Sequence, residues 1–298
     1  MKITHISILL CFWLMLLAGS AAGGETCGCD VPASTVARYD QALTAIPSGQ
    51  GIIRHAPWGL PVAAAAHADD IQVLVQPNWI TGFDPRLHMP VWVMYRLSAD
   101  DLSTRRHRTQ CFRPDPRLNT IVGGSDCASF RRSGMDRGHM VPSADMTRSE
   151  QAMVNTYVFS NIAPQYAGFN RTIWRELETR VRDMARRDES LYVISGAIFD
   201  YDADGKPDAA ASVPLTHNHN GTVHPAIASH FYKVVVETAG LKLRVSAWLL
   251  RHEDRDVAHK DAERMLQQAR VPVSTIEAMS GLDLMPLLDR ALTETAER

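Results

Sequence analysis

The sequence predicts an α+β protein with a mixed or antiparallel sheet flanked by helices. Strand-like and helix-like hydrophobic patterns follow one another along the 298-residue chain, and neither an internal repeat nor a linker after residue 50 divides them into further domains. Hydrophobic residues make up 45% and charged residues 21% of the chain. This composition supplies a sizeable core and excludes a largely disordered or polytopic membrane protein. We therefore expect a single domain over residues 51–298.

The first 22 residues have the features of a secretory signal peptide. Lys2 provides a basic start, Ile6–Leu17 form an apolar stretch, and small residues follow up to Ala22. The apolar stretch is shorter than the ~20 residues that a membrane-spanning helix needs, so an uncleaved anchor is the less favoured alternative. We expect cleavage near Ala22 and a secreted or periplasmic protein without membrane attachment afterwards.

The next part of the chain predicts one helix and two strands. Residues 23–50 indicate a linker and a short helix over Val36–Leu43, which the Pro- and Gly-rich residues 47–51 end. Runs of β-favouring residues predict strands at Ile71–Val75 and Val91–Leu97.

The remaining chain predicts one long loop followed by helices and strands. Residues 104–134 contain many arginines, prolines and glycines, and we expect mostly loop there. Spacings of three and four residues between apolar positions predict helices, and continuous apolar runs predict strands. The expected helices are Ser149–Tyr157, Thr172–Arg187, Val257–Gln268 and Asp283–Ala296, and the expected strands are Leu191–Ile194, Phe231–Glu237 and Leu241–Leu250.

Four cysteines remain after the signal peptide, an even number that fits an oxidising compartment. Cys111 and Cys127 would close a short loop, and this is the disulfide that we favour. Cys27 and Cys29 are too close in sequence for a relaxed bridge. A strained bridge between these two, free thiols, and pairing with another chain are the open alternatives.

The segment Asp136-Arg137-Gly138-His139 is the first candidate for catalysis. A neutral imidazole near pH 7 can take a proton from water, and the neighbouring glycine allows a tight turn that presents the ring. Because a single histidine in a polar loop is more often structural, this interpretation needs support from elsewhere in the chain.

A second segment, Ser160–Gln165 with the sequence SNIAPQ, is followed by Asn170 and Glu178. Asn170 precedes the predicted helix, where it serves either as an N-cap or as a metal ligand. Glu178 lies eight residues further on, and its side chain leans back toward the helix start, so both residues can face one cation. Mg²⁺, which keeps several waters, suits a direct Asn170 ligand and a Glu178 that acts through water.

Together these residues resemble a known family. The order of DRGH (136–139), SNIAPQ (160–165), Asn170 and Glu178 is similar to that of the DNA/RNA non-specific endonucleases of the endonuclease G-like kind. The resemblance covers roughly residues 90–280 and implies the ββα-metal, or His-Me finger, nuclease fold.

The resemblance also implies roles for single residues. His139 resembles the general base that activates water, and Asn170 resembles the direct ligand of Mg²⁺ or Mn²⁺. Glu178 resembles the residue that orients water around the ion. Arg137 resembles a phosphate-binding arginine, and Asn161 resembles a residue that shapes the site.

One further arginine is implied by the family pattern. Members carry an arginine a few residues before a stretch like Phe112–Pro116, which this chain has. We assign that position to Arg108, with Arg105 and Arg106 as close rivals.

The implied function is a secreted Mg²⁺-dependent endonuclease that hydrolyses phosphodiester bonds of DNA and RNA. Because such groups act on the nucleic-acid backbone, little base preference is expected. A homodimer and an inhibitor protein are further expected partners. The alternatives are a catalytically weak nuclease-like module that serves as a calcium-stabilised scaffold, and a phosphodiesterase that acts on small nucleotides.

A separate acidic loop resembles a calcium site. Carboxylates alternate around a glycine turn as in an EF-hand loop, although position 12 is Ala211 instead of glutamate. The segment is similar to the nuclease-like domain of secreted nucleotide pyrophosphatases/phosphodiesterases, whose cysteine spacing also supports the Cys111–Cys127 bridge. If Ca²⁺ binds here, we expect a structural role, and a solvated acidic turn is the alternative. The positions concerned are Asp200, Asp202, Asp204, Lys206 and Asp208.

The distribution of charge is more informative than its sum. The formal net charge of −2 does not by itself indicate a nucleic-acid binder. However, residues 105–137 hold eight arginines against three aspartates, and residues 171–187 hold six arginines against three acidic residues. Acidic residues are in excess at 200–208 and 253–298. We therefore expect local nucleic-acid binding that salt weakens.

Overall fold

The computed structural model describes residues 26–45, 48–63, 71–104, 106–118, 123–187, 190–239 and 242–289. The predicted signal peptide with its cleavage site, Arg105, and the last part of the predicted C-terminal helix lie outside these ranges. Within them, no helix has the length and apolarity that crossing a bilayer requires.

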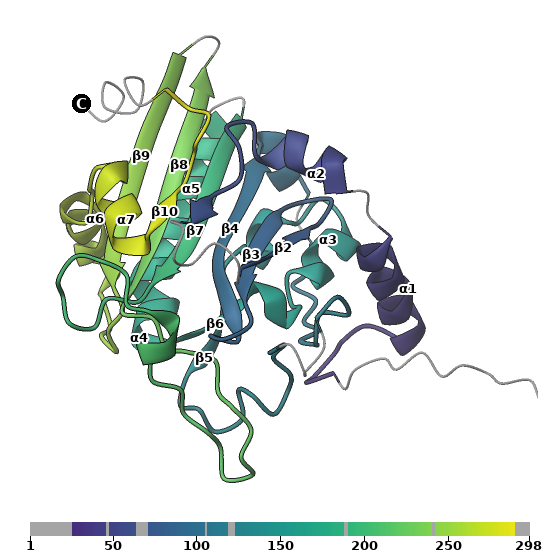
Figure 1. Ribbon diagram of the computed structural model, residues 1–298. Helices are drawn as coiled ribbons and strands as arrows, with labels where there is room; N and C mark the ends of the chain where they lie inside the picture. Colours follow the sequence, from purple (N-terminus) through teal and green to yellow (C-terminus); the bar gives the residue numbers. More distant parts are fainter. Residues whose placement is uncertain are drawn as a thin grey trace, which may run out of the picture.

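A six-stranded sheet forms the centre of the molecule (Figure 1). Its order is β2-β3-β4-β7-β8-β9, and every pair of neighbours is antiparallel. This arrangement confirms the predicted α+β class and decides for an antiparallel sheet. The strands are β2 (Gln72–Val75), β3 (Ile80–Asp84), β4 (Met89–Leu97), β7 (Ser190–Ile198), β8 (His230–Ala239) and β9 (Lys242–Arg251).

The two middle strands, β4 and β7, are buried along almost their whole length. Such burial requires cover on both faces of the sheet, and it explains the continuous apolar runs in these segments. Helices α5 (Arg175–Arg187) and α7 (Val273–Ser280) pack against β7, and α6 (His259–Gln268) packs against α5. Figure 1 shows α6 and α7 beside β9, while α1 (Ala33–Thr44) lies at the opposite side of the molecule.

A small hairpin and a helical segment form the ββα unit. Strands β5 (Asp136–His139) and β6 (Ile162–Gln165) pair antiparallel, so the DRGH segment is a strand. The chain then enters α4 (Ala167–Phe169), passes through a π-helical turn over Asn170–Trp174, and continues into α5. The predicted ββα-metal architecture is thereby confirmed. A further two-stranded pair joins β1 (Val62–Ala63) to β10 (Leu282–Asp283).

Helix α2 (Ser48–His55) lies where we predicted the end of the first helix. Glycine is a poor helix former, and Gly51 therefore indicated a break. The structure shows why glycine is present here, since a Cβ on Gly51 would lie 2.3 Å from Val75 Cγ1. Close packing of the helix backbone against β2 thus outweighs the local preference.

Strand β3 and helix α7 also lay outside the predicted elements. In β3, Gly82 interrupts the apolar pattern because the Trp92 ring fills the space that a Cβ would take. The predicted C-terminal helix is wrong over its described part, residues 283–289, where β10 is followed by irregular chain. Pro286 lies in this stretch, and proline disfavours a helix interior because it lacks an N–H and its ring clashes with the preceding turn. The remaining helix of the described chain is α3 (Glu150–Asn155), as expected.

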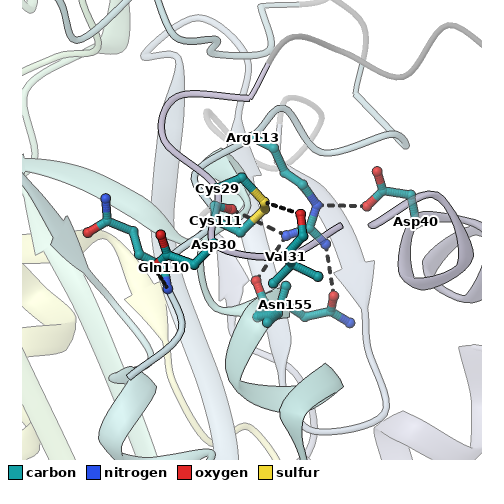
Figure 2. Close-up of a disulfide and its surroundings, with 9 residues drawn as sticks. Cys29, Asp30, Val31, Asp40, Gln110, Cys111, Arg113 and Asn155 are labelled. Carbon is teal, nitrogen blue, oxygen red and sulfur yellow. Dashed lines mark hydrogen bonds and ion pairs between the residues drawn. A yellow bond between two sulfur atoms is a disulfide. The ribbon is translucent and has the colours of Figure 1, made fainter. Parts of the chain in front are cut away.

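Two disulfides join the N-terminal segment to the body of the protein. Cys29 is bonded to Cys111 and Cys27 is bonded to Cys127, so the predicted Cys111–Cys127 bridge is wrong. Figure 2 shows the first of these bridges. The reason is that residues 27–30 run beside residues 110–112, with Cys27 N donating to Phe112 O at 2.9 Å. Each cysteine of the close pair thus faces a different distant partner.

Arg113 connects the same region to two helices. Its side chain is buried, and it donates to Asp40 Oδ1 of α1 at 2.8 Å and to Asn155 Oδ1 of α3 at 2.9 Å (Figure 2). It also donates to the Val154 carbonyl at 2.9 Å. A buried arginine with several charge-assisted partners holds its surroundings in one arrangement, so the irregular segment 104–118 has a defined position in its described part.

Candidate active site

The β5–β6 hairpin sets the direction of the DRGH side chains. Gly138 pairs with Ala163 and His139 pairs with Ile162. Because side chains alternate along a strand, Arg137 and His139 share one face and Asp136 points to the other. Two of the predicted site residues are thereby brought side by side.

His139 lies against aromatic rings. The Tyr157 ring stands edge-on at 4.6 Å between centroids, and the Phe112 ring lies at 5.7 Å. The histidine is 9% exposed, and its Nε2 is buried without a hydrogen-bond partner among the described residues. Burial, with a smaller effect of the Arg108 charge, lowers the pKa of His139 to about 3. The ring is therefore neutral at pH 7, and one nitrogen is free to accept a proton.

Arg137 lies next to the same aromatic cluster. Its guanidinium is 4.9 Å from the Phe112 centroid and 5.9 Å from that of Phe159. Stacking on rings holds a guanidinium without using its N–H donors, and none of these donors has an acceptor in the described part of the chain. Arg137 is therefore arranged to bind an anion.

The structure separates Arg108 from Arg106. Arg108 donates through Nε to the Tyr157 hydroxyl at 2.7 Å and acts electrostatically on both His139 and Glu178. Arg106 instead faces the Arg148 carbonyl at 3.5 Å and lines a different hollow of about 620 Å³. Of these two candidates, Arg108 is the one that the fold brings to the site.

Asn161 is fully engaged by the backbone. Its Oδ1 accepts from Val141 N at 2.9 Å, and its Nδ2 donates to the carbonyls of Val141 and Thr156 at 3.0 and 2.8 Å. The side chain therefore ties the end of the DRGH strand to the chain that precedes SNIAPQ. This arrangement suits a residue that shapes the site and leaves no N–H of the amide for a substrate.

Asn170 is not the N-cap of a helix. It lies inside the continuous helical segment, and its Nδ2 donates to Asp136 Oδ2 at 2.9 Å. The same carboxylate accepts two hydrogen bonds from Arg171, at 2.8 and 2.6 Å. These bonds offset the effect of burial and lower the pKa of Asp136. Asp136 thus fixes the Asn170 amide. Asn170 Oδ1 has no hydrogen-bond partner among the described residues.

Glu178 follows Asn170 along the helical segment, after the π-helical turn. It is half-buried, and burial raises the pKa of its carboxyl group. The fully buried Lys233 of β8 opposes this shift through its positive charge, while its own pKa is lowered by burial. The Lys233 ammonium lies 4.7 Å from the centroid of a Trp174 ring and donates to the Ser195 hydroxyl.

A second buried carboxylate completes the surroundings of Glu178. Asp145 accepts from the Tyr95 hydroxyl at 2.7 Å and from Arg182 Nη1 at 3.0 Å. Arg182 lies one helical turn after Glu178 and acts on both carboxylates. Glu178 therefore stands in a prearranged electrostatic environment built from α5, β4 and β8.

The oxygen donors fit a hard divalent cation. Asn170 presents an amide oxygen whose orientation is set through Nδ2, and Glu178 adds a carboxylate. Oxygen ligands of this kind, few in number and completed by water, are what Mg²⁺ takes from proteins.

The acidic loop gathers three of its five predicted positions. One carboxylate oxygen each of Asp200, Asp202 and Asp204 lies within 4.8 Å of the others. Asp208 instead accepts from Tyr201 N at 2.8 Å, and Lys206 pairs with Asp204 at 3.5 Å. This cluster lies on the loop after β7.

Comparison with known proteins bears on this site. The model of the DNA/RNA non-specific endonuclease family matches residues 64–291. Mitochondrial endonuclease G of Bos taurus is 31% identical over 255 residues, covering 84% of this chain and 79% of the relative. The chain belongs to the DNA/RNA non-specific endonuclease family. Nuclease C1 of Cunninghamella echinulata is 30% identical over 226 residues, covering 72% of this chain and 83% of that protein.

A solved structure supports the fold of this endonuclease. A chain in the EndoG/EndoGI complex, described as showing the mechanism of EndoG inhibition, superposes with a TM-score of 0.62 at 24% identity. The match covers 83% of this chain and 96% of that chain. Family membership makes the protein a nuclease of a metal-dependent family with nucleic acids as its substrate class. Membership of this family therefore favours a nuclease over a catalytically weak module that serves as a scaffold.

Sequence reasoning missed several residues of the endonuclease site. Tyr157 contacts His139 and Arg108, while Asp145 and Lys233 surround Glu178. None of them belongs to a motif with characteristic spacing. A lysine inside the apolar run 231–237 is the one signal that indicated an unusual position, because buried lysines are rare unless they are paired.

Proposed function

We propose that this endonuclease hydrolyses phosphodiester bonds of DNA and RNA with Mg²⁺, that His139 is its general base, and that it acts outside the cytoplasm. The observation that carries this proposal is the buried, unpartnered Nε2 of His139 beside the free donors of Arg137. A neutral base next to an anion-binding arginine is the arrangement that phosphodiester hydrolysis requires.

The residues act on the substrate as follows. Arg137 and Arg108 bind phosphate oxygens by charge-assisted hydrogen bonds and place the phosphorus atom in line with a water molecule. The anionic phosphate favours the imidazolium form, so the pKa of His139 rises toward neutrality when the substrate binds. His139 then takes the proton as the water oxygen bonds to phosphorus and the bond to the 3′-oxygen breaks. The leaving oxygen takes a proton from solvent, and the other product carries a 5′-phosphate.

The cation has defined partners in this chain. Asn170 would hold Mg²⁺ directly through Oδ1, and Glu178 would act through water. When bound, the ion supplies Lewis-acid stabilisation of the charge on the phosphate. Asp136 keeps the Asn170 amide in place, so the Asp136→Asn variant should need more Mg²⁺ for half-maximal activity.

The experiment that tests this function compares three substrates. We expect supercoiled plasmid and single-stranded RNA to be cut with Mg²⁺ and left intact with EDTA, because the site acts on the backbone that both share. A small phosphodiester such as the p-nitrophenyl ester of thymidine monophosphate should be a poor substrate. Cleavage of the small ester alone would support the phosphodiesterase alternative and overturn the proposal.

Export is supported by the N-terminal sequence and by the two disulfides. Disulfides persist in oxidising compartments such as the bacterial periplasm or the extracellular space. Endonuclease G of Bos taurus, by contrast, is mitochondrial. N-terminal sequencing of the protein recovered outside the cytoplasm should begin near Gly23, and a chain that still begins with Met1 would contradict export.

Three further partners belong to the proposal, namely Ca²⁺, a second copy of the chain and an inhibitor protein. The Asp200, Asp202 and Asp204 cluster is offered as a structural Ca²⁺ site, and Ca²⁺ should raise the melting temperature of the wild type but not of Asp202→Asn. We also propose that the chain forms a homodimer and that an inhibitor protein binds it. Light scattering of the purified chain tests the first, and co-purification from the producing organism tests the second.

A further inference from the structure

Tyr157 touches two of the proposed catalytic groups at once. We propose that Tyr157 is a positioning residue of this nuclease, whose hydroxyl orients Arg108 and whose ring holds His139. The inference rests on the proposed function, because it assigns the support of the residues that would act on phosphate.

The hydroxyl of Tyr157 directs the Arg108 guanidinium. Arg108 Nε donates to the Tyr157 oxygen at 2.7 Å, and its Cζ lies 5.8 Å from the ring centroid. Arg108 is exposed and lies in a loop segment, and within the described chain this is its one hydrogen bond. Without the hydroxyl, a long side chain in this position has many rotamers and loses its fixed direction.

The bond through Nε has a chemical consequence. A guanidinium has five N–H donors, and four of them are on the two terminal nitrogens. Tyr157 occupies the single Nε–H, so Arg108 presents its terminal nitrogens end-on. Two parallel bonds from these nitrogens match two oxygens of one phosphate.

The ring of Tyr157 supports His139. The two rings are 4.6 Å apart and nearly perpendicular, at 87°, and Tyr157 is itself fully buried. This edge-to-face geometry is a favourable aromatic arrangement. Phe112 flanks both His139 and Tyr157. The ring therefore fixes the plane of the imidazole and keeps water from one of its sides.

Tyr157 is held by neighbouring backbone. Its N–H donates to the Val154 carbonyl at 3.2 Å, and its carbonyl accepts from Arg113 N at 3.2 Å. Asn161 Nδ2 donates to the carbonyl of the preceding Thr156 at 2.8 Å. A residue fixed in this way can set the position of its contacts to within a few tenths of an ångström, as a preorganised site requires.

The test separates the hydroxyl from the ring. Tyr157→Phe removes one oxygen atom, and Tyr157→Leu removes the ring as well. Tyr192→Phe is the matched control, because Tyr192 packs on Trp58 at 5.0 Å on another part of the sheet. Rates on a defined duplex with Mg²⁺ and affinities for the same duplex in EDTA are measured for each variant, also in an Arg108→Ala background.

We expect Tyr157→Phe to lower kcat/KM about tenfold, as loss of one hydrogen bond to a charged group does. The same substitution in the Arg108→Ala background should change the rate by less than about twofold, because its effect runs through Arg108. Affinity for the duplex in EDTA should fall in Tyr157→Phe and Arg108→Ala alike. Tyr192→Phe should match the wild type in both measurements.

The ring is tested by NMR titration of His139 in metal-free protein. Arg108 is the charged group of the described chain that acts on His139, and both tyrosine variants retain it. Tyr157→Leu admits water, so the pKa of His139 should rise toward its ordinary value of about 6.5. Tyr157→Phe keeps the ring, so the pKa of His139 should change far less than in Tyr157→Leu.

Three results would overturn the proposal. These are a Tyr157→Phe variant as active as the wild type, an equal loss with and without Arg108, and a His139 titration that Tyr157→Leu does not move. A wild type that cuts no nucleic acid refutes the proposed function instead. In that case the duplex affinities and the NMR titration still decide whether Tyr157 positions the two residues.

Discussion

At the scale of the residue, the environment of His139 decides its protonation state. The ring is surrounded by Tyr157 and Phe112 and has Arg108 as its charged neighbour. Burial and a nearby positive charge both disfavour imidazolium, so the folded protein keeps the His139 ring in the neutral form that can accept a proton.

This leads to a first prediction for the metal-free protein. The pKa of His139 is lowered to about 3, so its ring resonances should not shift between pH 8 and pH 5 in an NMR titration. A His139 resonance that titrates with a midpoint near 6.5 would show that the ring is solvated and would contradict the described burial.

A second prediction concerns Arg108, the arginine proposed to bind phosphate. Arg108→Ala should lower kcat/KM at least tenfold. For comparison, removal of one preorganised hydrogen-bond donor from an oxyanion hole lowers kcat by about 10²–10³. Arg106→Ala, a neighbouring arginine with a different environment, should stay within about twofold. The reverse order of the two effects would transfer the role to Arg106.

The residues of the candidate site differ in how far sequence could reveal them. His139, Asn170 and Glu178 lie in or near short motifs, so their spacing along the chain identifies them as candidate site residues. Tyr157 and Lys233 come from segments that look like an ordinary helix end and an ordinary strand. Their roles arise from contacts across the fold, which no local pattern encodes.

At the scale of the element, the disulfides decide where the N-terminal segment lies. Bridges 27–127 and 29–111 join cysteines that are 100 and 82 positions apart in the sequence. Both bridges lie beside Phe112, which lies against His139. Cross-links over such long loops restrict the unfolded chain strongly.

A third prediction follows for these bridges. Reduction should lower the free energy of unfolding by about 2–4 kcal/mol per bridge, measured by denaturant unfolding with and without a reductant. Peptide mapping without reduction should recover the peptide that carries Cys27 and Cys29 joined to both the Cys111 peptide and the Cys127 peptide. A Cys111–Cys127 peptide would contradict the described pairing.

Some elements could be predicted and others could not, for a physical reason. The amphipathic spacing of Leu177, Val181 and Met184 predicts α5 because a helix face on a sheet repeats locally. Helix α2 and strand β3 contain Gly51 and Gly82, which are present because Val75 and Trp92 need the space. In the sequence, such glycines look like breaks in a helix or a strand. In the fold, they allow a neighbouring side chain to pack closely against the backbone. The predicted disulfide pairing was wrong for a similar reason, because residues 27–30 and 110–112 are far apart in the sequence and meet only in the folded protein.

At the scale of the whole molecule, three buried histidines connect stability to pH. His55 and His252 each accept a backbone N–H on one ring nitrogen and lie 2.9 and 2.8 Å from a carbonyl on the other. Both rings are therefore held neutral. Burial is the main cause that lowers the pKa values of His55 and His252 to about 4 and the pKa of His139 to about 3.

A fourth prediction gives the sign of this effect. Unfolded histidines bind protons below about pH 6.5 and the folded ones do not, so stability is full above pH 6.5 and is lost as pH falls toward 4. The loss at pH 5 is about 2 kcal/mol per histidine. The raised pKa of Glu178 acts in the opposite direction, so a variant is needed to isolate one histidine.

His252→Gln provides that comparison. Between pH 7.5 and pH 5, denaturant unfolding should show the wild type losing about 2 kcal/mol more than His252→Gln. Equal losses in the two proteins would mean that His252 is not held neutral by its contacts with Tyr166 and Ala228.

The central claim is that His139 is the base of a cation-dependent nuclease, and the rate of plasmid nicking by His139→Ala tests it most directly. His55→Ala is the matched control, because it removes another buried imidazole, whose partners are Pro77 and Arg96 and not residues of the site. With Mg²⁺ present, His139→Ala should nick supercoiled plasmid about 10²–10⁴-fold more slowly than the wild type, the usual contribution of a general base, while folded His55→Ala stays far closer to the wild type. Nicking by folded His139→Ala at the wild-type rate would contradict the account.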